Sequence, residues 1–188
     1  MKRLALLFAA LLATSSMALA AETYTIDGAH SSANFTVRHM GISTVHGRFT
    51  DVSGTILFDE KNPEKSSVTA VIKATSVNTD NATRDKHLGT PDFFDSATYP
   101  DIKFQSTSIK KVEGDKYVAV GNLTIRDVTK QVEIPFTLAA GKGMKGEPRL
   151  GVEATLTINR FDYHVSYDPT GMGVSKEVKI ELSVEAGK

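Results

Sequence analysis

Apolar and polar residues alternate along most of the chain after residue 20. The alternation runs through residues 33–39, 55–59, 68–77, 101–109, 117–125, 132–138, 152–158 and 178–184. A period of two residues is typical of a β-strand with one buried face. Clusters of turn-forming residues separate several of these stretches, at 59–63, 113–115 and 141–146. The pattern therefore predicts an all-β chain, folded as an antiparallel meander of about eight strands.

One region has a helical character instead. Residues 81–88 are charged and poor in β-branched residues, and Gly89 follows them as a helix-ending residue. Thr90 can cap a second turn and Pro91 can occupy its first position, which predicts one short helical region at residues 81–95. A helix this short is unstable alone in water, so we expect it to lean on the sheet as a lid or buttress.

Each predicted strand carries its apolar residues on a single face. In residues 152–158, for example, the alternation has no exception. A sheet with one dry side buries it by closing into a barrel or by folding into a sandwich. We favour the barrel, because closure removes the open edges at which sheets aggregate. The interior of a barrel of about eight strands is either filled by side chains or holds one small ligand, and the pattern leaves both open.

Residues 1–20 have the pattern of a targeting segment. Lys2 and Arg3 precede an apolar run at residues 4–13, and Ala18-Leu19-Ala20 matches the small-x-small pattern of signal peptidase sites. The run is shorter than the ~20 apolar residues that span a bilayer. We therefore expect a cleaved secretory signal peptide at residues 1–20 and a single domain at residues 21–188, with no integral membrane segment in the mature protein.

Charge and cysteine usage narrow the class of protein further. The chain has 188 residues with 22 basic and 22 acidic side chains, and removal of the signal leaves it slightly acidic. A protein that neutralises many phosphates needs an excess of Lys and Arg, so we expect no nucleic-acid partner. The absence of Cys excludes disulfides, thiolate metal sites and lipoprotein attachment. Export without disulfides best fits a bacterial periplasm.

Polar residues that could carry chemistry are few. His30, His39 and His46 are close in sequence, but their spacing matches no metal motif, and we expect no metal site. Asp85 and His87 are a candidate acid and base in the predicted helix. Arg84 beside Asp85 favours the simpler interpretation of an ion pair that fixes the helix on the barrel rim. A contact to a ligand head group is the functional alternative for Arg84 and His87.

One nucleotide-binding motif is a false match. Residues 141–146 satisfy G-x-G-x-x-G, but another alternating strand follows them where the motif requires a helix. We expect a flexible hairpin there. Residues 169–173 are rich in Gly, and we expect them to form a loop that borders the barrel mouth. The chain has no nucleophile elbow, HExxH or P-loop, which favours a protein that is not an enzyme.

Motifs spread over the whole mature chain resemble those of the YceI-like family of exported, lipocalin-like, polyisoprenoid-binding proteins. Together they are specific, whereas each alone would be weak. They comprise Tyr24-Thr25-Ile26-Asp27, His30-Ser31, Phe35, Val37-Arg38-His39, Gly41, Gly47-Arg48-Phe49, Gly54, Phe58-Asp59, Thr75-Ser76-Val77-Asn78-Thr79, Arg84-Asp85-Lys86-His87-Leu88, Asp92-Phe93-Phe94-Asp95, Tyr99-Pro100, Phe104, Gly121-Asn122-Leu123-Thr124-Ile125 and Val128-Thr129-Lys130.

The resemblance implies a lipocalin-like antiparallel barrel with a helix near one end and an apolar tunnel. The tunnel would hold an isoprenoid, a quinone-like lipid or a similar long-chain amphiphile, with no cofactor besides this ligand. The resemblance also implies a homodimer, and it supplies no catalytic residues. The inward apolar rows, the aromatic residues near the helix and three polar residues are the candidate ligand-binding set. They are Phe35, Val37, His39, Phe49, Ile72, Arg84, His87, Leu88, Phe93, Phe94, Phe104, Leu123, Ile125, Phe136, Leu156 and Ile158.

These expectations lead to three hypotheses about function. The first is a periplasmic lipid-binding protein that serves transport, storage or stress protection. The second is an exported, stress-linked binding or structural module whose core is filled by its own side chains. The third is an enzyme that acts on a bound lipid through His39 or the region of residues 85–87.

Overall fold

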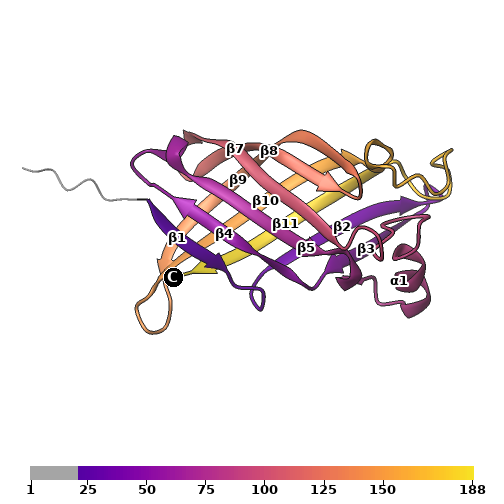
Figure 1. Ribbon diagram of the computed structural model, residues 1–188, viewed down its shortest axis with the longest axis horizontal. Helices are drawn as coiled ribbons and strands as arrows, with labels where there is room; N and C mark the ends of the chain where they lie inside the picture. The colour runs from indigo at the N-terminus through magenta and orange to yellow at the C-terminus, as the bar shows by residue number, and fades with distance from the viewer. Residues whose placement is uncertain (1–20) are drawn as a thin grey trace, which may run out of the picture.

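The barrel in Figure 1 is built almost entirely from antiparallel strands. This computed structural model describes residues 21–188, so the predicted signal peptide at residues 1–20 lies outside the described residues. The strands are β1 (Glu22–Ile26), β2 (Ser32–His39), β3 (Ser43–Phe49), β4 (Val52–Phe58), β5 (Ser67–Lys73), β6 (Val77–Asn78), β7 (Asp101–Glu113), β8 (Lys116–Ile125), β9 (Val128–Lys142), β10 (Pro148–Asn159) and β11 (Glu177–Gly187).

The sheet closes on itself through β1 and β11. Its order is β1-β4-β5-β7-β8-β9-β10-β11, and β11 pairs with β1 through Ile26 and Ala186. These strands form the closed antiparallel barrel that the alternation predicted, with the lipocalin-like fold that the resemblance implied. Further along the same edge of β11, Leu182 pairs with Ala33 of β2. β2, β3 and β6 therefore extend the wall beyond the closed part, toward the end that carries the helix.

Two strands and one break were not predicted correctly. β1 and β3 were missed, and the predicted strand at residues 68–77 is interrupted by the 3-10 turn η2 (Ala74–Ser76). At this break, the Ser76 carbonyl accepts from the Thr50 amide at 3.2 Å, and the Ser76 hydroxyl accepts from the Asp51 amide at 3.1 Å. These bonds join η2 to the residues that connect β3 to β4.

The helix α1 (Ala82–Leu88) is shorter than the predicted region of residues 81–95. Asn81 caps it, because its side chain accepts a hydrogen bond from the Arg84 amide. The predicted second helical turn is wrong. The amides of Phe93 and Asp95 both donate to the Thr90 carbonyl, at 3.0 and 2.9 Å, and Asp95 adopts a positive φ of 47°. A left-handed residue ends helical propagation, so the chain continues as consecutive turns.

The two ends of the barrel are built differently. At the end away from α1, Tyr24, Phe58, Tyr117 and Leu150 are buried, and the Phe58 and Tyr117 rings lie 6.2 Å apart. Burial and a hydrogen bond to Glu22 raise the pKa of Tyr24 to about 12. At the other end, α1, the turns after it and the loop of residues 164–176 gather around the extended strands (Figure 1). Within residues 21–188, no helix has the length and apolar character needed to cross a membrane.

Candidate functional site

A cavity of about 460 Å³ lies inside the barrel. This volume is in the range of ~300–1,000 Å³ that is usual for small-molecule sites. The largest fully buried side chain of the described residues is Leu150. Many other inward side chains, such as Leu156 and Leu182, are only partly buried although they point away from the outer surface. Their remaining exposed area faces the cavity, so the interior is hollow.

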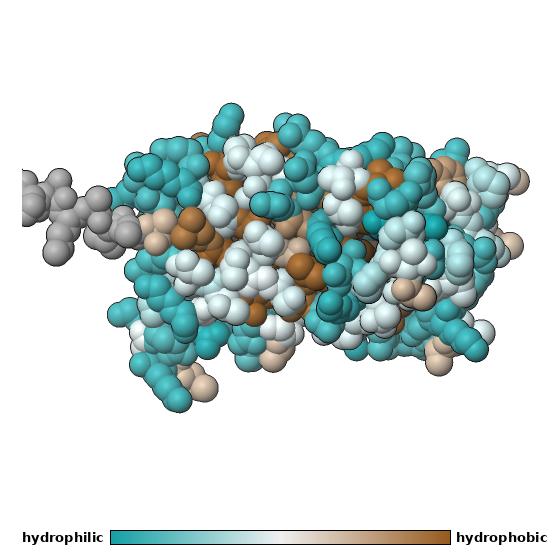
Figure 2. Space-filling model, in the orientation of Figure 1, coloured by the Kyte–Doolittle hydropathy of each residue, from teal (hydrophilic) through white to brown (hydrophobic). Residues whose placement is uncertain are grey.

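The outer surface has a different chemistry from the interior. Figure 2 shows mainly hydrophilic and neutral side chains on the face in view, with hydrophobic side chains between them. On β10, Glu153, Thr155 and Thr157 are exposed, whereas Leu156 and Ile158 line the cavity. The alternation read from the sequence therefore separates the lining from the outer surface.

All of the residues predicted to bind a ligand line this cavity. The structure brings together the inward strand rows, the aromatic residues near α1 and the polar residues His39, Arg84 and His87. That these residues contact a ligand stays a prediction, because the cavity shows a place for one and not its identity.

Aromatic rings surround the cavity at the end that carries α1. The Phe49 ring lies 5.6 Å from that of Phe35 and 5.4 Å from that of Phe94. A second group joins α1 and the turns after it to the loop of residues 164–176. Its Tyr167 ring lies 5.1 Å from that of His87 and 4.9 Å from that of Phe93. Aromatic pairs at these distances add stabilisation beyond burial alone. The segment around α1 is therefore attached to the loop of residues 164–176 directly over the cavity.

The predicted ion pair between Arg84 and Asp85 is wrong. Both side chains bind Thr79 instead: Arg84 Nη2 donates to the Thr79 carbonyl at 2.7 Å, and Asp85 Oδ1 accepts from the Thr79 amide at 2.9 Å. Nor do Asp85 and His87 form a pair, since His87 Nε2 lies 2.8 Å from Asp92 Oδ2. The Thr79 hydroxyl lies between Arg84 and Asp85: it accepts from Arg84 Nε at 2.7 Å and donates to Asp85 Oδ1. Sequence proximity does not reveal such a shared partner.

A buried arginine organises the loop of residues 164–176. Arg160 is 4% exposed and lines the cavity. Its guanidinium donates to five backbone carbonyls, those of Val165, Tyr167, Asp168, Val174 and Ser175. Burial lowers the pKa of Arg160 from its usual value. The buried hydrogen-bond donors of Arg160 find these acceptors only in this loop conformation, so Arg160 sets the shape of the cavity rim.

Residues 169–173 form a loop, as their composition predicted, and the lining residues Tyr167 and Val174 flank them. Tyr167 and Val174 line the cavity, and Tyr167 is 43% exposed. His39, which also lines the cavity and is exposed, forms a β-bridge with Val174. Lining residues that are open to solvent thus gather where β2 meets this loop, and we take this end as the mouth.

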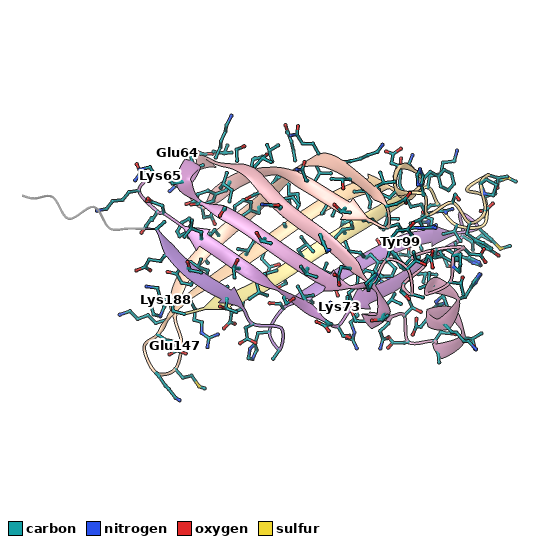
Figure 3. The ribbon with its side chains drawn as sticks, viewed as in Figure 1. Glu64, Lys65, Lys73, Tyr99, Glu147 and Lys188 are labelled. Atoms are coloured by element: carbon teal, nitrogen blue, oxygen red, sulfur yellow. The ribbon has the colours of Figure 1, made fainter. Side chains whose placement is uncertain are left out.

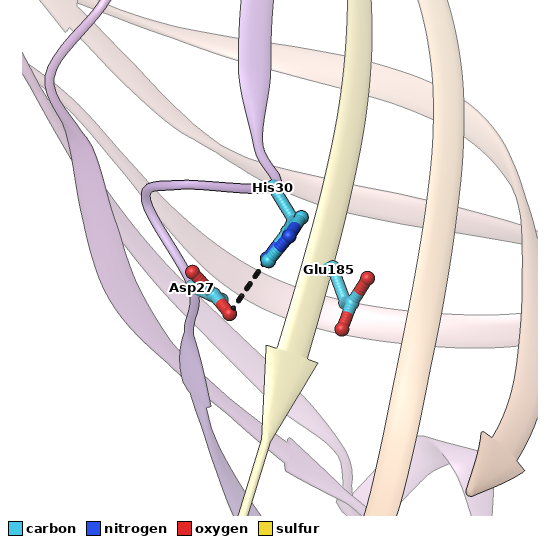
Figure 4. A group of neighbouring side chains, drawn as sticks. All are labelled: Asp27, His30 and Glu185. Carbon is cyan, nitrogen blue, oxygen red and sulfur yellow. Dashed lines mark hydrogen bonds and ion pairs between the residues drawn. The ribbon is translucent and has the colours of Figure 1, made fainter. Parts of the chain in front are cut away.

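The three histidines considered as metal ligands do not converge. His39 lines the cavity, whereas His46 lies on β3 opposite Thr36, with the opposite parity, and His30 lies in the loop before β2. His30 belongs to a separate group with Asp27 and Glu185, whose nearest ligand atoms lie within 4.8 Å of one another (Figure 4).

The charges of that group are matched by a nearby arginine. Arg149 Nη1 donates to Asp27 Oδ2 at 3.3 Å and to Glu185 Oε1 at 3.1 Å. The hydrogen bond to Asp27 raises the pKa of His30. We interpret the group as an ion-pair cluster that joins the loop of residues 27–31 to β10 and β11.

Sequence reasoning missed several lining residues. Val45 lies on β3, where Val45, Gly47 and Phe49 alternate with polar residues; this signal was present but weakened by the glycine. Tyr167 and Val174 lie in an irregular loop that has no periodicity to detect. Arg160 follows β10 directly, and nothing in the sequence pattern there indicates a buried arginine.

Comparisons with known proteins agree with this fold. A sequence model described as the YceI-like domain matches residues 24–186. Protein YceI of Salmonella agona is 43% identical over 182 residues, which is 95% of this chain and 93% of that protein. The crystal structure of BcnA from Burkholderia cenocepacia superposes with a TM-score of 0.78 at 25% identity, over 85% of this chain and 98% of that one. A polyisoprenoid binding domain from Saccharophagus degradans has a TM-score of 0.68 over 87% of this chain and 97% of that one, and at 18% identity it is similar in fold alone.

Proposed function

The chain belongs to the YceI-like domain family, and from this premise we propose that it is a lipid-binding protein whose barrel holds an isoprenoid, quinone-like or other long-chain amphiphile. The ligand would lie along the cavity with its hydrocarbon chain against the inward strand rows. Burial of a hydrocarbon chain is worth ~0.8 kcal/mol per methylene, so about ten carbons supply ~8 kcal/mol before the costs of ordering are subtracted. Tight binding then needs no polar contact along the tunnel.

The observation that carries the proposal is the hollow, apolar interior. A barrel filled by its own side chains would have fully buried Leu, Ile and Val residues along every strand. Here the inward residues of β9, β10 and β11 are mostly only partly buried, and a cavity of about 460 Å³ separates them. This favours a binding protein over the alternative of a module with a filled core. The polyisoprenoid binding domain from Saccharophagus degradans shares the fold, which is consistent with the same class of ligand.

The candidate acid and base residues favour binding over catalysis. Asp85 is bonded to Thr79, and His87, which lines the cavity, is paired with the exposed Asp92. Neither arrangement presents a nucleophile with its activating base to the cavity. We propose a role as a periplasmic carrier or store of the lipid, which the predicted signal peptide supports.

Native mass spectrometry of the full chain expressed with its signal, followed by solvent extraction, tests the proposal. We expect mass added to the mature protein and a long-chain lipid in the extract. Delipidated protein should take up geranylgeraniol as a probe and bind it at one site. Protein that is repeatedly empty, and that ignores the added probe, would reject the proposal.

A further inference from the structure

Large exposed apolar side chains gather at the mouth of the cavity. Met40 is 62% exposed, Ile42 81%, Met172 75% and Tyr167 43%. They come from two segments, the turn between β2 and β3 and the loop of residues 164–176. We call residues 38–42 and 167–176 together the mouth tip.

Hydrogen bonds hold the two segments of the mouth tip side by side. The Met40 amide donates to the Gly173 carbonyl at 2.9 Å, and the Ser175 amide donates to the Arg38 carbonyl at 2.9 Å. His39 and Val174 form a bridge between these bonds, and both residues line the cavity. The exposed apolar side chains of the mouth tip are therefore continuous with the cavity lining.

Met40 occupies a backbone position that does not suit it. Its φ is 52°, in the left-handed region that favours Gly and Asn. A long apolar side chain here is unfavourable both for the backbone and for its contact with water. Strained backbone positions of this kind are concentrated at functional sites.

Cations exceed carboxylates in the mouth tip by one. Its charged residues are Arg38, Lys176 and Asp168. The Asp168 carboxylate accepts hydrogen bonds from the Gly173 and Val174 amides of its own loop. Arg38 stabilises the turn between β2 and β3, because its Nη2 donates to the carbonyls of Gly41 and Ile42. Both acceptors are neutral, so neither offsets the positive charge of Arg38.

The opposite end of the barrel has a different combination of side chains. Figure 3 shows Glu64, Lys65, Glu147 and Lys188 there, so charges of both signs are mixed. Met144 is fully exposed in the hairpin between β9 and β10, but Lys142, Lys145 and Glu147 surround it in the sequence. Exposed apolar residues that occur singly are usual, whereas a cluster of them indicates an interaction site.

We propose that the mouth tip docks on a lipid bilayer with anionic head groups. Met40, Ile42 and Met172 would enter the apolar boundary of the bilayer, while Arg38 and Lys176 meet the head groups. Docking in this way places the cavity mouth against the bilayer, so a lipid passes between the two without crossing water. Only this passage of a lipid between bilayer and cavity rests on the proposed function. The exposed apolar cluster and its charged residues are observed whether or not the protein binds a lipid.

Co-sedimentation of the mature protein with vesicles tests the docking. We expect binding to vesicles of equal parts phosphatidylcholine and phosphatidylglycerol, weaker binding to phosphatidylcholine alone, and a loss of binding at high salt. The Met40→Asn and Ile42→Ser double variant should bind about a hundredfold more weakly, the loss expected when two apolar side chains no longer enter the bilayer. Lys176→Gln should weaken binding to the anionic vesicles alone. Val112→Ser with Met144→Ser is the matched control, and it should bind like the unaltered protein.

Met40→Asn alone separates docking from folding. Asn suits the left-handed position, so this variant should have a higher midpoint of thermal unfolding and weaker vesicle binding. Unaltered protein that ignores anionic vesicles, or a double variant that binds as well as it, would overturn the proposal. A dimer in sedimentation that Ile42→Ser abolishes would also overturn it, because the mouth tip would then be covered by a second copy. Lipid content, measured in parallel, distinguishes failure of docking from failure of the proposed function.

Discussion

Arg160 and Asp168 hold the same loop through complementary groups. Nη2 of Arg160 donates to the backbone carbonyl of Asp168 at 3.3 Å, while the Asp168 carboxylate accepts from the amides of Gly173 and Val174 at 2.7 and 3.0 Å. The cation thus satisfies carbonyls and the anion satisfies amides of one irregular segment. This segment bears Tyr167 and Val174 of the cavity lining, so the shape of the mouth depends on the pair.

Arg160→Met should destabilise the protein by about 3 kcal/mol, because five backbone carbonyls lose their donor and several become buried without a partner. Chemical denaturation measures the change in the free energy of unfolding. Lys130→Met is the control, since its ion pair with Asp162 is exposed and 3.6 Å long and should contribute less than ~1 kcal/mol. Equal effects of the two substitutions would contradict the role of Arg160.

Asp168→Asn should lower the midpoint of thermal unfolding at neutral pH but not near pH 2. Hydrogen bonds from the Thr170 hydroxyl and from the Val174 and Gly173 amides lower the pKa of Asp168 to about 2. The unfolded value is about 3.9. Because the folded pKa is the lower one, the contribution is complete above about pH 4 and is lost as the pH falls toward 2. Midpoints of both proteins measured from pH 7 to pH 2 should converge at the acid end, and a constant difference would speak against the assignment.

Leu156→Trp should reduce lipid uptake without unfolding the barrel. Leu156 is partly buried and faces the cavity, so a larger side chain there occupies space that the proposed ligand needs. The affinity for geranylgeraniol should fall about tenfold, as expected for the loss of about two buried methylenes. Thr155→Trp introduces the same residue on the outer face of β10 and should retain full uptake. If the two variants retain equal amounts of probe, the ligand does not lie along β10.

Two glycines should respond differently to substitution by alanine. Gly54 has a φ of 147°, and an added Cβ would overlap the Thr69 carbonyl, so Gly54→Ala should cost about 3 kcal/mol or more. At Gly47 the overlap is with the Phe35 ring, which borders the cavity and can move into it. Gly47→Ala should therefore cost less than ~1.5 kcal/mol but reduce lipid uptake. Thermal unfolding and probe binding measure both effects, and a Gly47 variant as unstable as the Gly54 variant would show that Phe35 is rigidly held.

The alternation of residues determined the class of fold and most of the cavity lining. A strand places alternate residues on opposite faces, so the rows that include Phe136, Leu156 and Ile158 had to share one side of the sheet. The YceI-like motifs then indicated both the lipocalin-like barrel and a family. Neither the pattern nor the motifs could give the partners of polar side chains, and the Arg84 and Asp85 pair failed for this reason.

Only the tertiary structure decided that the barrel is hollow and where it opens. Whether facing apolar rows touch depends on the tilt and bending of the strands. The turn η2 and the break between β1 and β2 change both, and these two features are far apart in the sequence. The mouth likewise joins residues 38–42 to a loop more than a hundred positions later, through backbone bonds that no periodicity encodes. Local alternation specifies which face of a strand is dry, whereas the space enclosed by that face is a property of the closed sheet as a whole.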